Sequence, residues 1–196
     1  MATSEHWLRS ALVQPPAAGR VVYMYRIVTV CTGNICRSPM AEYLLRRAAE
    51  ESGLDGVVVD SAGVSDEEQG NPIDPRARKV LARLGIDTQD HSARQVTRRD
   101  LADCDLVLAL DLPHEKALRR MASDEEQASK IHLLREFDPA VSDQAHEDLG
   151  IYDPWYGDAS DFEATFAMIR DAVDGVIEEA SGDPRARSAS DHSDGA

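Results

Sequence analysis

Residues 26–39 read Arg-Ile-Val-Thr-Val-Cys-Thr-Gly-Asn-Ile-Cys-Arg-Ser-Pro. The first five are mostly apolar and β-branched, a pattern that favours a short strand. Gly33 and Asn34 tolerate the positive φ angles that a tight loop needs. Ser38 and Pro39 are typical of the N-cap and the first position of a helix. The stretch therefore predicts a strand, a tight loop and a helix in succession.

Further strand and helix signals alternate along the rest of the chain. Apolar strands that alternate with helices imply a parallel sheet covered on both faces. We therefore expect an α/β fold, a doubly wound three-layer sandwich that binds its ligand beyond the carboxyl ends of the strands. The expected strands are 26–30, 57–59, 106–110 and 131–134, and the expected helices follow Pro39, cover 75–84 and 114–121, and follow Asp161.

The 196 residues fit one domain, for which we expect the bounds 24–180. Residues 1–23 lack periodicity and predict a flexible extension, and 181–196 have little to bury and predict a disordered tail. The net charge of −15 argues against nucleic acid and anionic membrane as partners. Three irregularly spaced cysteines suit a reducing cytoplasm.

The loop after the first strand has the composition of an anion site. Backbone N–H groups that point inward, with a helix dipole behind them, favour a phosphate. Next to these groups and to Arg37, Cys31 is expected to be a thiolate nucleophile that forms a phosphocysteine. The planar fork of Arg37 fits two phosphoryl oxygens, and the Ser38 hydroxyl is close enough in sequence to donate to the Cys31 sulfur. Fixed dipoles supply the stabilisation, so we expect neither metal nor cofactor.

If the substrate is an ester of phosphate with tyrosine, the departing tyrosine oxygen needs a proton, because the pKa of the phenol is about 10. The segment Asp-Pro-Trp-Tyr-Gly that begins at Asp153 offers a carboxylic acid. Trp155 and Tyr156 would then form a wall against a phenyl ring. From the residues alone an Asp-Pro pair is more often a turn, so the role of Asp153 stays open at this point.

Taken together, these residues resemble the low-molecular-weight protein tyrosine phosphatase family of bacterial type, over about residues 25–178. The resemblance implies the four-stranded parallel sheet of the phosphotyrosine phosphatase I-like fold and a two-step cysteine mechanism. It also implies Asp153 as the general acid, tyrosine-phosphorylated proteins as substrates, and a tyrosine kinase as a further partner. The motifs that carry it are Cys31 to Pro39, Asp60-Ser61-Ala62-Gly63, Asp74-Pro75-Arg76, His91 with Ala93-Arg94-Gln95-Val96, Asp111, Asp138-Pro139 and the segment that begins at Asp153.

The same resemblance assigns supporting roles. Ser61 and His91 would join Asn34 and Ser38 in a hydrogen-bond network, although His91 taken alone reads as a surface residue. Asp111 would orient Arg37. The second loop cysteine, Cys36, would form a disulfide with Cys31 under peroxide, with simple loop packing as the alternative. The expected phosphate-binding loop comprises Thr32, Gly33, Asn34, Ile35, Cys36 and Ser38.

One stretch departs from the family pattern. Many relatives have a tryptophan after the Asp-Ser-Ala-Gly motif, whereas residues 65–69 here read Ser-Asp-Glu-Glu-Gln. The substrate mouth therefore lacks that aromatic side, and we expect acidic phosphopeptides to be disfavoured.

Three other functions fit the same loop. Arginine phosphatases of this family typically carry threonine where this chain has Ile35, and a bulkier side chain favours a flat aryl group. Arsenate reductases need a further redox cysteine pair, and only Cys104 lies downstream. A non-catalytic phosphopeptide-binding module would usually lack Cys31, Arg37 or Asp153, all of which are present. We therefore expect a protein-tyrosine-phosphatase, with an arginine phosphatase or a binding module as the alternatives.

Overall fold

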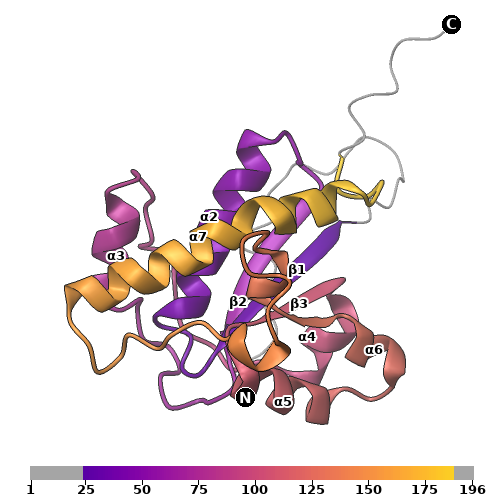
Figure 1. Ribbon diagram of the computed structural model, residues 1–196, viewed down its shortest axis with the longest axis horizontal. Helices are drawn as coiled ribbons and strands as arrows, with labels where there is room; N and C mark the ends of the chain where they lie inside the picture. The colour runs from indigo at the N-terminus through magenta and orange to yellow at the C-terminus, as the bar shows by residue number, and fades with distance from the viewer. Residues whose placement is uncertain (1–23, 188–196) are drawn as a thin grey trace, which may run out of the picture.

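The computed structural model describes residues 24–187, so the predicted extension 1–23 and residues 188–196 of the predicted tail lie outside the described residues. Strands and helices alternate within this part, as the sequence predicts. In chain order the elements are β1 (Tyr25–Cys31), α2 (Arg37–Glu51), β2 (Val57–Gly63), α3 (Pro75–Ala82), α4 (Arg98–Asp103), β3 (Leu106–Ala109), α5 (Leu112–Met121), α6 (Glu125–Ser129), β4 (Ile131–Leu133), the 3-10 turns η1 (Leu134–Phe137) and η2 (His146–Asp148), and α7 (Ala159–Ser181) (Figure 1).

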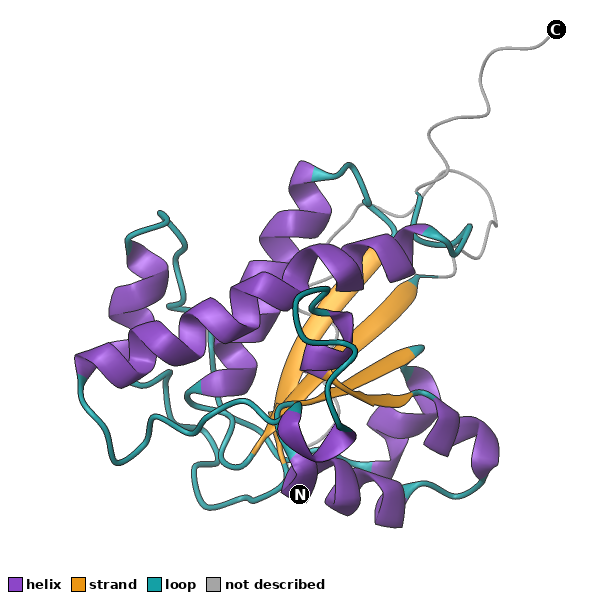
Figure 2. Cartoon of the chain, viewed as in Figure 1, coloured by secondary structure: helices purple, strands orange, loops and turns teal. Residues whose placement is uncertain are grey.

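The four strands form one sheet with the order β2-β1-β3-β4, and every neighbouring pair is parallel (Figure 2). The predicted four-stranded parallel sheet is therefore confirmed. Cys31 at the end of β1 pairs with Gly63 at the end of β2, and Val30 pairs with Ala109 at the end of β3. The carboxyl ends of three strands thus meet at one edge of the sheet, where α/β folds bind their ligands.

The side chains of β1 alternate between two apolar clusters. Ile27 packs in the cluster that contains the buried residues of α2, α3 and α7, whereas Val28 and Val30 pack in the cluster that contains those of α4 and α5. All three side chains are fully buried. Burial on both faces explains the nearly continuous apolar run of this strand and gives the three layers of the sandwich.

The start of α2 differs from the prediction. The helix begins at Arg37 with Cys36 at the N-cap, so Ser38 is the second helical residue and Pro39 the third. The predicted cap at Ser38 is wrong, because the Ser38 hydroxyl instead accepts from Asn34 in the loop and donates to the carbonyl of Ala62 in β2 at 3.1 Å. Proline remains acceptable here, because N–H groups in the first turn have no partner within the helix.

The predicted domain boundary at 180 is too early. α7 ends at Ser181, but Ala186 beyond it is fully buried, and its carbonyl accepts a 3.0 Å hydrogen bond from the backbone N–H of Gly56. Arg185 pairs with Asp105 at 2.8 Å. The packed domain therefore extends to Ala186.

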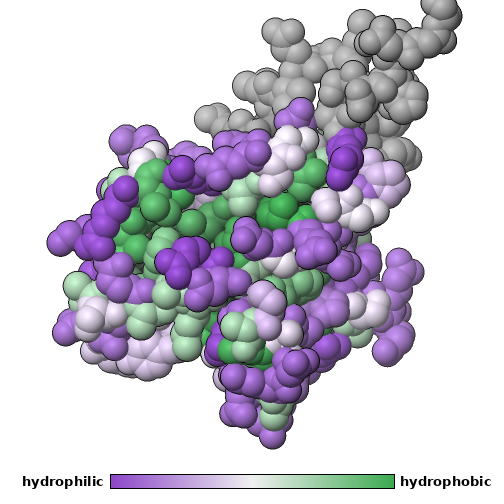
Figure 3. Space-filling model, turned by 45° about the horizontal axis from the view of Figure 1, so that its top comes forward, coloured by the Kyte–Doolittle hydropathy of each residue, from purple (hydrophilic) through white to green (hydrophobic). Residues whose placement is uncertain are grey.

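The large hydrophobic side chains that are exposed within residues 24–187 are Leu84, Tyr152, Trp155 and Tyr156. Figure 3 shows hydrophilic residues over much of one face, with hydrophobic residues visible between them near its middle. Within residues 24–187, no helix combines the length and the apolar composition that crossing a membrane requires.

Candidate active site

The candidate site is the loop between β1 and α2. Cys31 is the last residue of the strand and Arg37 the first of the helix. Asn34 has a φ of 60°, as expected for the tight turn, but Gly33 does not have a positive φ. A Cβ atom at position 33 would lie 2.8 Å from Cγ of Glu68, so the side chain of Glu68 would have to shift to admit one.

Asn34 is the centre of the network that holds the loop. Its side-chain N–H group donates to the hydroxyls of Ser38 at 3.0 Å and Ser61 at 2.7 Å. Its Oδ1 accepts from the backbone N–H of Arg94 at 2.9 Å. Nε2 of His91 lies 2.7 Å from the Asn34 carbonyl, which can only accept, so Nε2 carries the hydrogen. The four residues expected to form a network are thus in contact.

Burial lowers the pKa of His91, so this ring is neutral at neutral pH. Its hydrogen bond to the Asn34 carbonyl therefore does not need a charged imidazole. His91 is a loop residue whose ring packs edge-on against Tyr43, with ring centroids 6.5 Å apart. His91 is thus a partly exposed loop residue, in line with its sequence position, and its ring also takes part in the network.

Cys31 is 3% exposed, and its sulfur lies 3.1 Å from the Ser38 hydroxyl, the contact expected from their spacing. Thr32 follows at an exposed position of the loop. Ile35 and Cys36 are both buried in the apolar cluster on the α2 side of the sheet. Burial raises the pKa of the Cys36 thiol, and both loop cysteines are free thiols.

Arg37 is 2% exposed and its guanidinium contacts two carboxylates. One terminal nitrogen lies 2.8 Å from Asp111 and 3.1 Å from the carbonyl of Ile151, and the other lies 2.5 Å from Asp153. Burial alone would raise the pKa of Asp111, but its contacts with His114 and Arg37 outweigh burial and lower the pKa to about 2. Asp111 is therefore a carboxylate placed where it can orient the arginine.

The Asp153 segment lies over the loop and is held by Arg76. The Arg76 guanidinium donates to the carbonyls of Gly157 at 2.9 Å and Trp155 at 3.3 Å. One carboxylate oxygen of Asp153 accepts a 3.1 Å hydrogen bond from the backbone N–H of Trp155. Trp155 is 40% exposed and Tyr156 is 98% exposed, so both rings are accessible beside the acid. Arg76 stands in the motif Asp74-Pro75-Arg76, but its position in the sequence does not indicate this contact with the Asp153 segment.

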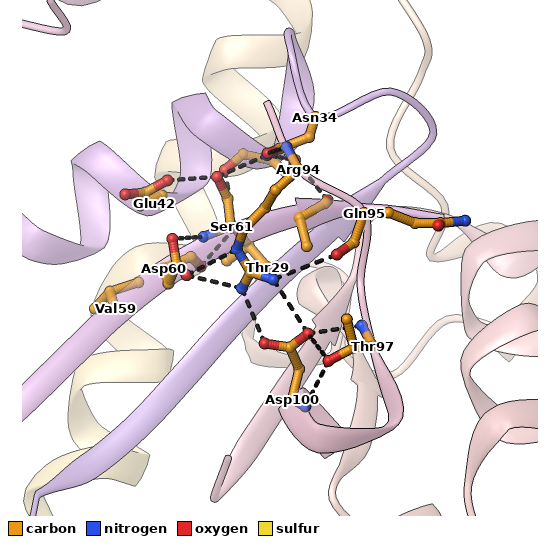
Figure 4. A network of polar contacts seen from close by, with 12 residues as sticks. Thr29, Asn34, Glu42, Val59, Asp60, Ser61, Arg94, Gln95, Thr97 and Asp100 are labelled. Atoms are coloured by element: carbon orange, nitrogen blue, oxygen red, sulfur yellow. Dashed lines mark hydrogen bonds and ion pairs between the residues drawn. The ribbon is translucent and has the colours of Figure 1, made fainter. Parts of the chain in front are cut away.

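Glu42 of α2 is a buried carboxyl that the sequence analysis missed. It accepts a hydrogen bond from the Ser61 hydroxyl (Figure 4). It also pairs with Arg46 at 2.5 Å. Burial raises its pKa to about 7. Glu42 follows Ala41 and precedes apolar residues in a helix, and only the fold shows that its face is covered.

Arg94 supports the same network from the opposite side. Its guanidinium lies between Asp60 at 2.7 Å and Asp100 at 3.1 Å (Figure 4). Asp100 also closes the capping box of α4 with Thr97. These ion pairs fix the position of Arg94, whose backbone N–H donates to the Asn34 side chain.

Glu42→Gln tests the effect of this buried carboxyl on stability. Because the pKa of Glu42 is higher in the folded chain, about 7, than its ordinary value of 4.5, the wild type loses stability as the pH rises between these values. Relative to the wild type, the glutamine variant should therefore gain on the order of 3 kcal/mol between about pH 4 and about pH 8. Urea unfolding at both pH values measures this change.

Glu50→Gln, at an exposed position of α2, is the matched control. A difference in unfolding free energy between Glu42→Gln and the wild type that stays constant with pH would contradict the assignment.

The chain is similar in sequence to known protein phosphatases. A family described as "Low molecular weight phosphotyrosine protein phosphatase" matches residues 26–185. The chain is 46% identical over 154 residues to the "Low molecular weight protein-tyrosine-phosphatase" of Streptomyces coelicolor, which covers 78% of this chain and 92% of that protein. It is 44% identical over 151 residues to the "Low molecular weight protein-tyrosine phosphatase A" of Mycobacterium tuberculosis, which covers 76% of this chain and 88% of that protein.

Solved structures agree with the sequence relatives. The structure of YfkJ from Bacillus subtilis matches with a TM-score of 0.73 and 33% identity, covering 84% of this chain and 98% of that chain. A protein tyrosine phosphatase from Entamoeba histolytica also has a TM-score of 0.73, with 27% identity, covering 81% of this chain and 97% of that chain. On the family match, the relatives and the shared fold, this chain belongs to the low-molecular-weight phosphotyrosine protein phosphatase family.

Proposed function

We propose that this protein hydrolyses phosphotyrosine in proteins, with Cys31 as the nucleophile, Arg37 as the phosphate clamp and Asp153 as the general acid. The observation that carries the proposal is the placement of these three groups around one short loop. The Cys31 sulfur lies at the end of the strand, the buried guanidinium lies at the start of the helix, and the Asp153 carboxyl contacts that guanidinium. Thr32, Gly33, Asn34, Ile35, Cys36 and Ser38 would supply the rest of the phosphate site.

In the first step the Cys31 thiolate attacks phosphorus, so an S–P bond forms while the bond from phosphorus to the tyrosine oxygen breaks. Asp153 transfers its proton to the departing phenolate. Arg37 binds two of the phosphoryl oxygens, and the backbone N–H groups of the loop bind the third.

In the second step a water attacks the phosphocysteine. The Asp153 carboxylate takes a proton from this water, inorganic phosphate forms, and the cysteine leaves as a thiolate. The Ser38 hydroxyl lies 3.1 Å from the sulfur, so its single hydrogen can turn from the Ala62 carbonyl to the leaving thiolate and stabilise it. Trp155 and Tyr156 would lie beside the tyrosine ring.

The contact between Arg37 and Asp153 has a consequence for substrate binding. Without substrate, a 2.5 Å ion pair holds the Asp153 carboxylate against the Arg37 guanidinium. An acid that donates a proton must itself be protonated, and the phosphoryl oxygens need the same guanidinium edge. Substrate binding therefore has to break this pair, after which Asp153 is free to approach the tyrosine oxygen.

The proposal extends to partners and setting. A tyrosine kinase is the enzyme class that would supply its substrates. Cys31, Cys36 and Cys104 are all free thiols, which suits a reducing compartment such as the cytoplasm. The family match and the names of the relatives do not favour the alternatives, an arginine phosphatase or a non-catalytic binding module.

The reaction is tested with matched peptides that carry phosphotyrosine, phosphoserine or phosphoarginine, with EDTA present and Cys31→Ser as the control. We expect strong preference for phosphotyrosine and no turnover by the serine variant, because a serine hydroxyl is a far weaker nucleophile than a thiolate. Preference for phosphoarginine would contradict the discrimination assigned to Ile35. Activity on none of the peptides would favour the binding module.

Asp153→Ala tests the acid. Aryl phosphates with poor leaving groups should lose about 100-fold or more in rate, because they depend most on protonation, whereas those with acidic phenols should lose much less. The measurement is the first-step rate across a series of substituted phenyl phosphates. An equal loss across the whole series would remove Asp153 as the proton donor.

The mouth of the site predicts a charge preference. Glu68 lies against Gly33, and its carboxylate accepts from Asn71 at 2.7 Å, so a negative charge is held beside the phosphate loop. Phosphotyrosine peptides with basic flanks should therefore exceed those with acidic flanks in kcat/KM. Glu68→Gln should reduce that ratio about fivefold, the effect of one charge contact near a protein surface.

Glu67→Gln is the matched control, because Glu67 is an exposed neighbour in the same loop. An unchanged ratio in Glu68→Gln, or an equal change in both variants, would show that Glu68 does not set the preference.

A further inference from the structure

His114 is a buried histidine beside the site that the mechanism above does not use. It lies in the first turn of α5 and is 2% exposed. Its Nε2 lies 2.9 Å from the Thr32 hydroxyl, and its Nδ1 lies 2.7 Å from one oxygen of Asp111. The other oxygen of Asp111 contacts Arg37 at 2.8 Å. An unbroken path of polar contacts thus joins position 32 of the loop to position 37.

The proton positions along this path follow from the groups present. A carboxylate only accepts, so at 2.7 Å the Nδ1 atom must carry a hydrogen to avoid placing two lone pairs against each other. The N–H is not well aligned with the oxygen, so the contact is chiefly electrostatic. A neutral His114 then accepts at Nε2 from the Thr32 hydroxyl, and a charged one donates to it. The link persists in either protonation state.

The Asp111 carboxylate is held on both of its oxygens. One accepts from the backbone N–H of His114 at 3.0 Å and faces the His114 ring, and the other faces Arg37. The ring therefore fixes a carboxylate that in turn fixes the guanidinium. Within residues 24–187, Asp111 and Asp153 are the two carboxylates paired with Arg37.

We propose that His114 is a positioning residue for catalysis, one that ties Thr32 to Asp111 and thereby holds Arg37 in the plane that the phosphoryl group needs. The inference rests on the proposed function, in which substrate binding separates Asp153 from Arg37. From that moment Asp111 is the carboxylate that orients the clamp, and it depends on His114. The link therefore matters most in the substrate complex and its transition states.

A histidine that only fills space beneath α5 would behave differently. Its loss would lower stability, and with it the fraction of folded enzyme, but each folded molecule would keep its turnover number. A positioning role lowers kcat per active site, because a misplaced clamp binds the transition state less well.

The test is a double-mutant cycle with His114→Ala and Thr32→Val, in which the valine keeps the shape of threonine but removes its hydroxyl. kcat and KM are measured with a phosphotyrosine peptide, and active sites are counted by alkylation of Cys31. We expect each variant to lose about 10-fold in kcat, with a much smaller change in KM. The double variant should lose no more than the single ones, because both break the same link.

His114→Asn serves if the alanine variant does not fold, because its shorter amide reaches toward Asp111 but not as far as Thr32. It should show the same loss in kcat. His146→Ala is the matched control, since His146 contacts Glu115 of the same helix at 2.8 Å and takes no part in the path. Its kcat should match the wild type.

Turnover per active site within about twofold of the wild type in the His114 variants would overturn the inference. Losses in the two single variants that multiply in the double variant would also overturn it, because the two residues would then act independently. A wild-type protein inactive on phosphotyrosine would instead contradict the proposed function, so the two failures can be told apart.

Discussion

The burial of Arg37 is the constraint on which the rest of the site depends. A guanidinium that is 2% exposed would cost several kcal/mol to desolvate without partners. Its partners are Asp111 after β3 and the Ile151 to Asp153 segment before α7, both far along the chain. The clamp is therefore satisfied only when the sheet has formed and the later segment has closed over it. Folding and assembly of the phosphate site are in this sense one event.

The loop itself is fixed by a second set of contacts around Asn34. A left-handed residue other than glycine is unfavourable on its own, and here the side chain and the carbonyl are both hydrogen-bonded. Ser61 in turn donates a hydrogen bond to Glu42, and Arg94 forms an ion pair with Asp60. Backbone N–H groups held in this way need little rearrangement when a phosphate arrives, which is how fixed dipoles lower a reaction barrier.

Most of the fold could be predicted because each strand is a short apolar run between clear helices. The loop was predictable too, since Cys31 to Ser38 combines a nucleophile, a cation and turn residues within one stretch. The contacts that support the loop were harder to predict from the sequence. Glu42 reads as a surface residue until the fold covers it, and His114 meets Thr32 only because α5 starts at the carboxyl edge of the sheet. Short helices such as α4 and α6 show too few residues for periodicity to appear.

The proposed mechanism requires that a phosphoryl group is carried on the Cys31 sulfur. The most direct measurement mixes the protein with excess phosphotyrosine peptide, quenches within the first turnover and maps the phosphorylated peptide by mass spectrometry. We expect one phosphoryl group on the peptide that contains Cys31, and a burst of dephosphorylated product equal to the enzyme concentration. A phosphoryl group on another residue, or turnover with neither burst nor phosphoenzyme, would contradict this mechanism.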